Sequence, residues 1–232
     1  MQDKANTVLR VEGLSKAYGN QQVLNNLAFS IKRAERVAIV GPSGSGKSTM
    51  LNCLAGLETP DSGRIEFLGR DLVGMPEAEV TELRRGNLTS VFQFFHLLPT
   101  LQARENVEFP LLLENASRSE RKEKVGELLE EVGLTHRSRA WPSELSGGEM
   151  QRLAIARALI TEPAMILADE PTGSLDAKNS ERILELLSKL AERHGTALLI
   201  VTHDPVASAD CDRILHMLDG KLDEGAVEAQ TS

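Results

Sequence analysis

Apolar runs and helical repeats alternate along the central and C-terminal parts of the chain. The runs Val37–Val40, Ala164–Ala168 and Ala197–Thr202 have the length and the apolar character of buried strands. Between them, apolar residues recur at the spacing of one face of a helix. Strands that alternate with helices in this way predict a parallel sheet of the α/β class.

Further patterns divide the rest of the chain into predicted elements. The predicted helices are Thr49–Leu57, Glu77–Arg85, Arg118–Val132, Gly148–Ile160 and Asn179–Arg193. The other predicted strands are Val8–Glu12, Val23–Ile31, Arg64–Leu68 and Leu88–Gln93, with a terminal hairpin of Arg213–Met217 and Lys221–Asp223 around Asp219 and Gly220. Gly133 is expected to end the third helix as a C-cap residue.

The order of these elements predicts a single domain with a mixed sheet. The early strands indicate an antiparallel β portion near the N-terminus, and the middle of the chain is mostly helical. We therefore expect a core of about residues 1–93 and 160–225 and a helical subdomain of about residues 94–159. Residues 226–232 are expected to form a flexible tail.

Length and charge limit the classes of function. A chain of 232 residues can bury one substantial core, and its net charge of −8 without a basic stripe argues against a nucleic-acid partner. Cys53 and Cys211 lack metal-ligand spacing and are expected to be reduced thiols. No apolar run approaches the roughly 18 residues that span a bilayer, and the N-terminus lacks a signal-peptide pattern. A role at a membrane would therefore require a partner with spanning segments.

A glycine-rich segment follows the apolar run Val37–Val40 and precedes a predicted helix. It comprises Gly41, Pro42, Ser43, Gly44, Ser45, Gly46, Lys47, Ser48 and Thr49. In this context the glycines let consecutive backbone N–H groups turn inward around phosphates, and the helix N-terminus adds positive charge. Lys47 can reach the β- and γ-phosphates, and the Ser48 hydroxyl can ligate Mg²⁺. The segment predicts a P-loop, and with the sheet a P-loop NTPase core.

Two carboxylates follow the buried strand Ala164–Ala168. The carboxyl ends of the strands in a parallel sheet face the ligand crevice. There Asp169 can hold Mg²⁺, and Glu170 can polarise an attacking water. The alternative, two surface acids at the start of a loop, is disfavoured by the P-loop upstream.

A second candidate anion site opens a later helix. Ser146 is a suitable N-cap, and Gly147 and Gly148 leave backbone N–H groups accessible at the positive end of that helix. The five residues Leu145–Glu149 are by themselves also compatible with an ordinary capped helix.

Together these segments resemble the ATP-binding cassette (ABC) ATPases. The resemblance rests on Gly41–Thr49, on Leu145–Glu149 with the helix that follows, and on Ile166–Glu170 with Pro171 and Ser174–Asp176, in this order and spacing. It extends from about residue 8 to residue 222, so it covers nearly the whole chain.

The resemblance implies a role for each candidate residue. Tyr18 matches the aromatic residue that stacks on adenine, and Asp176 matches the D-loop aspartate at the dimer interface. The implied catalytic residues are Lys47, Gln93 of the Q-loop, Glu170 and the switch histidine His203. The implied Mg²⁺ ligands are Ser48, Gln93 and Asp169, and the implied signature residues on the nucleotide are Ser146, Gly147, Gly148 and Glu149.

The resemblance also implies a partner and a mechanism. Two copies of the chain pair head to tail, so that each ATP with its Mg²⁺ lies between the P-loop of one copy and the signature of the other. Every catalytic position is filled, and we therefore expect an active ATPase. One position departs from the family, because Ala34 stands where glycine is frequent; it would strain the turn if its φ is positive.

The segment Phe94–Val107 and the run Ala168–Asp176 resemble the ABC subfamily that contains MacB, LolD and FtsE. In that subfamily the segment after the Q-loop docks an integral membrane permease, so a permease is expected to dock near Phe94–Val107. The chain is then expected at the cytoplasmic face of the inner membrane as a peripheral subunit. Lipoprotein release, drug or peptide efflux and division control are all compatible with the resemblance.

Other functions stay open at this point. The principal alternative is a soluble ABC ATPase that acts on ribosomes or DNA, although such proteins usually carry two cassettes or a long coiled coil, and no sustained heptads occur here. A non-hydrolysing regulatory module is disfavoured by Lys47, Glu170 and His203. The cassette alone does not distinguish import from export.

Overall fold

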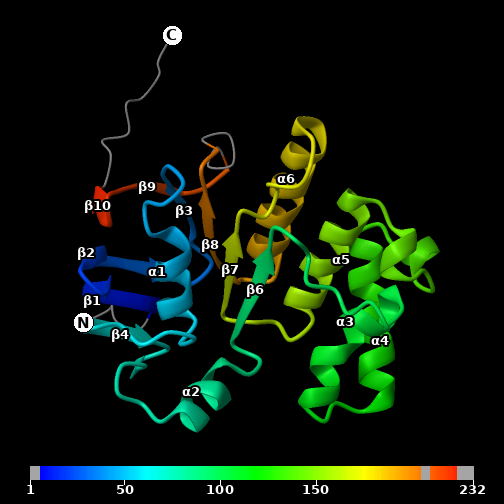
Figure 1. Ribbon diagram of the computed structural model, residues 1–232. Coiled ribbons are helices and arrows are strands. Elements are labelled where there is room, and N and C mark those ends of the chain that lie inside the picture. Colours follow the sequence, from blue (N-terminus) through cyan, green and yellow to red (C-terminus); the bar gives the residue numbers. More distant parts are fainter. Residues whose placement is uncertain (1–5, 205–209, 224–232) are drawn as a thin grey trace.

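The computed structural model describes residues 6–204 and 210–223 as two sheets with helices around them (Figure 1). The antiparallel sheet has the order β2-β1-β4-β5 and contains β1 (Thr7–Tyr18), β2 (Gln21–Lys32), β4 (Ser62–Phe67) and β5 (Arg70–Asp71). The second sheet has the order β10-β9-β3-β8-β7-β6 and contains β3 (Arg36–Val40), β6 (Leu88–Phe92), β7 (Met165–Asp169), β8 (Ala197–Thr202), β9 (Arg213–Leu218) and β10 (Lys221–Asp223). Strands β9, β3, β8, β7 and β6 run parallel, which confirms the predicted mixed sheet.

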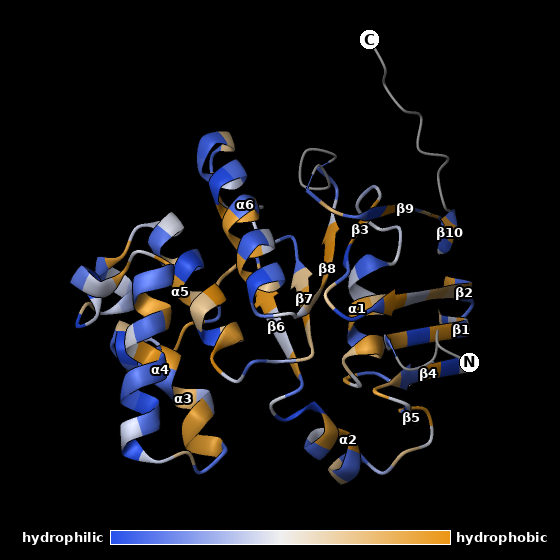
Figure 2. Cartoon of the chain, turned by 180° about the vertical axis from the view of Figure 1, so that it is seen from behind, coloured by the Kyte–Doolittle hydropathy of each residue, from blue (hydrophilic) through white to orange (hydrophobic). Residues whose placement is uncertain are grey.

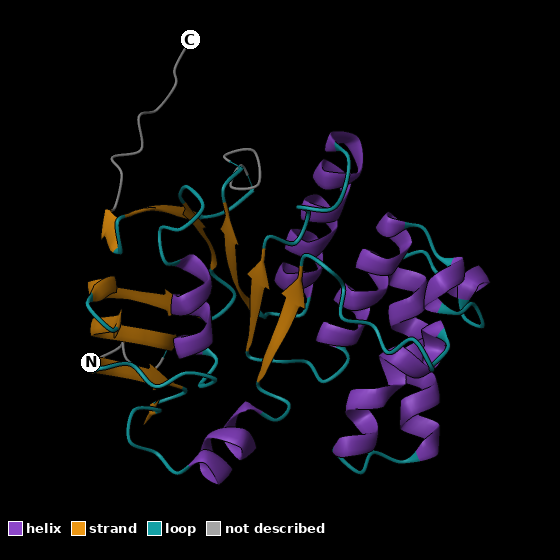
Figure 3. Cartoon of the chain, viewed as in Figure 1, coloured by secondary structure: helices purple, strands orange, loops and turns teal. Residues whose placement is uncertain are grey.

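The helices lie where the sequence places them, with one addition. They are α1 (Lys47–Leu54), α2 (Glu77–Arg84), α3 (Ala103–Leu113), α4 (Arg118–Glu131), α5 (Gly147–Leu159) and α6 (Ala177–Arg193), with single 3₁₀ turns at Thr135–Arg137 and Pro142–Glu144. Figure 3 shows α3, α4 and α5 gathered on one side of the strands. Helix α3 lies in the stretch expected to be mostly helical but was not predicted as an individual helix. The proposed subdomain boundaries stay a prediction.

The central strands of the six-stranded sheet, β3, β8 and β7, are buried on both faces. In β7, Ile166 and Ala168 pack into the core formed with α3–α6, whereas Met165 and Leu167 pack into the core formed with α1 and the antiparallel sheet. A strand covered on both sides needs apolar residues at every position, which explains the continuous apolar runs. Figure 2 shows these hydrophobic strands in the middle of the molecule.

Two helix boundaries differ from the prediction for local reasons. Helix α1 begins two residues early, at Lys47, because Gly46 adopts a left-handed conformation (φ 105°) as the N-cap residue, and it ends before Gly56 (φ 62°). Helix α6 begins at Ala177 because Asp176 caps it, with Oδ1 accepting the N–H of Asn179 at 3.0 Å.

Several turns have the predicted conformation. Asp219 and Gly220 have φ of 47° and 71° in the β9–β10 hairpin, and Gly133 has φ of 67° after α4. Ala34 does adopt a positive φ of 57°, so the departure from glycine is strained. Among the helices of the described residues, none is long and apolar enough to cross a bilayer.

Candidate functional site

The candidate residues leave adjacent parallel strands at one edge of the sheet. In the ladder, Phe92 pairs with Asp169, Asp169 with Val201, and Val40 with Thr202. The residues that come next in the chain are Gln93, Glu170, His203 and Gly41. This is the edge at which open α/β sheets bind their ligands.

The P-loop turns from β3 into α1, and no side chain of the described residues caps that helix. Gly44 and Gly46 have φ of 81° and 105°, which residues with a side chain rarely adopt. The first N–H groups of any α-helix lack a partner within the helix. Because no side chain caps α1, its first N–H groups are available to an anion. Lys47 is 7% exposed, and its Nζ donates to the carbonyls of Gly41 and Pro42 at 2.7 and 2.9 Å.

A cavity of about 350 Å³ lies in front of the P-loop. Its lining comprises Val23, Ser43, Gly44, Gly46, Lys47, Ser48, Thr49 and Glu170. Gly41, Pro42 and the buried Ser45 form the turn behind it. The structure thus brings the predicted P-loop residues together with the predicted catalytic glutamate.

The turn between β9 and β10 contacts the backbone of the P-loop. The N–H of Gly220 donates to the Ser45 carbonyl at 3.1 Å, and the Gly220 carbonyl accepts the N–H of Asn25 at 2.8 Å. A Cβ atom on Gly220 would lie 2.3 Å from the Val23 carbonyl oxygen. These contacts hold the P-loop between β2 and the hairpin.

Asp169 and Ser48 offer oxygen ligands on the P-loop side of β7. Burial raises the pKa of Asp169, and the neighbouring Ser48 hydroxyl and Lys47 ammonium offset part of that rise. A desolvated carboxylate beside a hydroxyl fits a hard divalent cation such as Mg²⁺. No cluster of three or more His, Cys, Asp or Glu suited to a metal occurs in the described part of the chain.

Glu170 is held from two sides by the end of β8. Its Oε2 accepts the Thr202 hydroxyl at 3.0 Å, and its Oε1 lies 2.9 Å from Nδ1 of His203. The backbone of Glu170 has a positive φ of 46°, a strained conformation for a residue with a side chain. The carboxylate is therefore fixed next to the P-loop cavity, where it can act on a water.

A second cavity, of about 480 Å³, lies at the N-termini of α5 and α6. It is lined by Ser146, Gly147, Gly148, Glu149, Arg152, Ser174, Leu175, Asp176, Asn179, Arg182 and Ile183. Glu149 closes a capping box, accepting the N–H of Ser146 at 2.9 Å, and this bond is the main reason that its pKa is lowered. The N–H of Asn179 likewise lowers the pKa of Asp176.

Gln93 and Tyr18 are not among the residues that line the P-loop cavity. The Gln93 side chain lies against Gly173, where a Cβ atom would come within 2.8 Å of Nε2, and its carbonyl accepts the Ser174 hydroxyl at 2.9 Å. Tyr18 lies at the end of β1, and its hydroxyl bonds to Glu58. Of the expected Mg²⁺ ligands, Ser48 and Asp169 contact each other, whereas the side chain of Gln93 lies against Gly173.

Sequence reasoning missed several residues around the two cavities. Arg152 and Arg182 add positive charge to the cavity at the N-termini of α5 and α6, here called the signature cavity, and the Asn179 side chain donates to Asp176 there. Arg152 is one helical turn beyond Gly148, and that spacing could have indicated a cation near the anion site. The sequence indicated Gly220 only as a turn residue. Its contact with Ser45 of the P-loop joins positions far apart in the sequence, and no local pattern predicts such a contact.

Comparison with known families decides the classification. Residues 24–173 match the ABC transporter family. The chain belongs to this family. Membership implies ATP binding and hydrolysis, and it confirms the resemblance noted in the sequence.

Three ABC proteins are similar over most of the chain. The Lipoprotein-releasing system ATP-binding protein LolD of Shewanella sp. (strain MR-4) is 44% identical over 234 residues, covering 99% of this chain and 100% of the relative. A dimeric structure of the bacterial ABC transporter cassette MJ0796 has a TM-score of 0.83 and 40% identity, covering 93% of this chain and 96% of that chain. CbiO1 of Clostridium perfringens, part of the CbiONQ transporter complex, has a TM-score of 0.87 and 30% identity, covering 94% and 87%.

The contact between the β9–β10 turn and the P-loop can be tested with matched glycine substitutions. Gly220→Ala should weaken ATP binding about ten- to hundredfold, because the new Cβ must displace the Val23 carbonyl and the P-loop with it. Gly74→Ala is the control, since Gly74 also has a positive φ (81°) but open space around its Cβ position. Isothermal titration calorimetry gives both affinities. Equal ATP affinity in the two variants would show that the turn does not position the P-loop.

Proposed function

We propose that this chain is the ATP-hydrolysing subunit of a membrane transporter and acts with a separate permease of the lipoprotein-releasing type. The observation that carries the proposal is that Lys47, at the start of α1, and Glu170, at the end of β7, line one cavity, with His203 in contact with Glu170. The similarity to LolD along 99% of this chain supports the transporter class.

ATP is proposed to lie in the P-loop cavity. The Lys47 ammonium would exchange the Gly41 and Pro42 carbonyls for β- and γ-phosphate oxygens, and the free N–H groups of α1 would hold the same phosphates. Tyr18 offers a half-exposed ring on which adenine can stack. Mg²⁺, held by Ser48 and Asp169 and, after a movement of its side chain, by Gln93, would neutralise charge on the phosphates.

Hydrolysis requires a water in line with the γ-phosphate. Glu170 is suited to orient and polarise that water because its carboxylate is already fixed by Thr202 and His203 at the border of the cavity. His203 is 60% exposed as a side chain, so its ring can turn from Glu170 toward the γ-phosphate. These residues act mainly by positioning and by charge stabilisation, as phosphoryl transfer demands.

A second copy of the chain is proposed to complete each site. The P-loop and signature cavities share no lining residue in the described part of the chain. Two copies related by a two-fold axis would place the Ser146–Gly148 N–H groups of one on the ATP of the other, with Asp176 at the interface. The dimeric structure of the MJ0796 cassette supports the pairing of two copies.

A permease is proposed to dock on the exposed apolar side chains after β6. Phe94 is 70% exposed, and α3 adds Phe109, Leu112 and Leu113. The docking segment is tied to the signature helix, since Arg157 of α5 donates to the carbonyls of Phe95 and His96. A displacement of the signature helix can thus be transmitted to the permease.

This apolar surface favours a permease over ribosomes or DNA as the partner. The net charge of −8 also argues against nucleic acid. The chain is accordingly proposed to be a peripheral subunit at the cytoplasmic face of the inner membrane. Lipoprotein release is the favoured process because the LolD relative is named for it.

Substitution of Glu170 tests the ATPase assignment. Glu170→Gln should lower the rate of ATP hydrolysis at least about 100-fold, because the amide cannot polarise water, while ATP binding is kept. With ATP and Mg²⁺ the variant should form a stable dimer, measured by sedimentation velocity. Glu127→Gln on the exposed surface of α4 is the control. Wild-type turnover by Glu170→Gln would refute the catalytic role.

Co-purification tests the permease. Tagged Glu170→Gln, isolated with ATP and Mg²⁺ from gently solubilised membranes, should retain an integral membrane protein with a large external domain, identified by mass spectrometry. Phe94→Ser should reduce its recovery several-fold, whereas Leu218→Ser, which changes another exposed apolar side chain on β9, should not. Recovery of ribosomes or DNA-bound proteins instead would move the assignment to the soluble class.

A further inference from the structure

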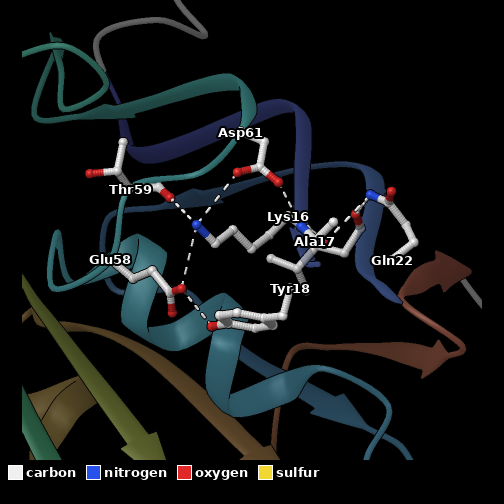
Figure 4. Close-up of polar contacts among 8 residues, drawn as sticks. Lys16, Ala17, Tyr18, Gln22, Glu58, Thr59 and Asp61 are labelled. Carbon is white, nitrogen blue, oxygen red and sulfur yellow. Dashed lines mark hydrogen bonds and ion pairs between the residues drawn. The ribbon is translucent and has the colours of Figure 1, made fainter. Parts of the chain in front are cut away.

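The ring of Tyr18 is anchored through its hydroxyl, as Figure 4 shows. The hydroxyl donates to Oε1 of Glu58 at 2.5 Å, and this bond is the main reason that the pKa of Tyr18 is raised. Tyr18 is 49% exposed and is the last residue of β1, next to Gly19. A half-exposed ring at the end of a strand is otherwise free to change rotamer.

Lys16 adds a second contact with the ring. Its Nζ lies 5.6 Å from the ring centroid of Tyr18 and 3.5 Å from Oε1 of Glu58, and it donates to the Thr59 carbonyl at 2.7 Å (Figure 4). Asp61 accepts the N–H of Ala17 at 2.6 Å. The end of β1 is therefore tied to the segment 58–61 by side chains of both signs.

Glu58 follows the C-terminus of α1, the helix that begins at the P-loop. The N–H groups of Leu57 and Glu58 both donate to the Asn52 carbonyl, at 2.9 and 3.2 Å, so the residue follows α1 without slack. Thr49, in the first turn of α1, acts on the pKa of Tyr18 in the opposite direction to Glu58 and lowers it. The P-loop thus lies at the N-terminus of α1, and Glu58, which binds the Tyr18 hydroxyl, lies just after the C-terminus of the same helix.

We propose that Glu58 is a positioning residue for the adenine base, which sets the orientation of the Tyr18 ring relative to the P-loop. The inference rests on the proposed function, in which adenine stacks on Tyr18. Since the ring is already ordered before ATP binds, stacking loses little side-chain freedom. Glu58 would contribute to ATP affinity only through the adenine base, because none of its atoms lines the P-loop cavity.

The test compares ATP with a ligand that has no base. Glu58→Ala should weaken ATP binding about two- to tenfold, the effect of ordering one side chain on binding, with an equal rise in KM and no change in kcat. Inorganic tripolyphosphate with Mg²⁺ should bind equally well before and after the substitution. Glu58→Gln keeps an acceptor oxygen and should restore ATP affinity. Glu12→Ala is the control, because Glu12 lies on β1, the strand that ends in Tyr18.

Tyr18 variants separate the possible failures. Tyr18→Phe removes only the hydroxyl and should weaken ATP binding as Glu58→Ala does, with no further loss in the double variant. If Tyr18→Ala weakens ATP binding and Glu58→Ala does not, the anchor is refuted and the stacking role stands. If Tyr18→Ala leaves ATP affinity unchanged, the stacking role fails and the anchor with it. Equal losses for ATP and tripolyphosphate would show that Glu58 acts through the structure of α1 instead.

Discussion

The register of the parallel sheet is the constraint on which the candidate site depends. A slip of one residue in β7 would exchange Ile166 and Ala168 for Met165 and Leu167 between the two cores, and every apolar side chain of the strand would face the wrong partner. Packing on both faces therefore determines where Asp169 leaves the sheet. The position of Asp169 at the end of β7 is thus determined by how the apolar residues earlier in the strand pack into the two cores.

The same constraint sustains local strain at the site. Glu170 keeps a positive φ because its N–H donates to the Val201 carbonyl at 2.9 Å while its carboxylate is held by Thr202 and His203. At the end of β3, which β8 separates from β7, the P-loop leaves the first N–H groups of α1 without a side-chain cap, which a folded protein tolerates when an anion is the intended partner. Both features reduce stability locally and are compatible with a site that must receive a charged nucleotide.

The sequence predicts the features that depend on local chemistry. Buried strands, the P-loop and the Asp219–Gly220 turn each follow from the residues that form them. Helix α3 was not predicted because Pro110 interrupts its pattern and its cap is Gln102, an unusual N-cap residue. The bond from Tyr18 to Glu58 joins positions 40 residues apart, and no local pattern encodes it. The orientation of Gln93 toward Gly173 likewise depends on how two loops pack.

In the proposed mechanism, the P-loop of a single chain binds ATP without help from a signature segment. The signature of each chain contacts only the ATP that a second copy holds. The most direct test is Gly148→Asp in the Glu170→Gln background, with Gly126→Asp as the control. The position has room, since the nearest atom to a Cβ on Gly148 is 3.9 Å away, and an acid in the first turn favours the helix while repelling phosphate. Titration with ATP and sedimentation velocity should show unchanged affinity in a protein that stays monomeric. Loss of ATP binding by the monomer, or a dimer as stable as the parent, would contradict the account.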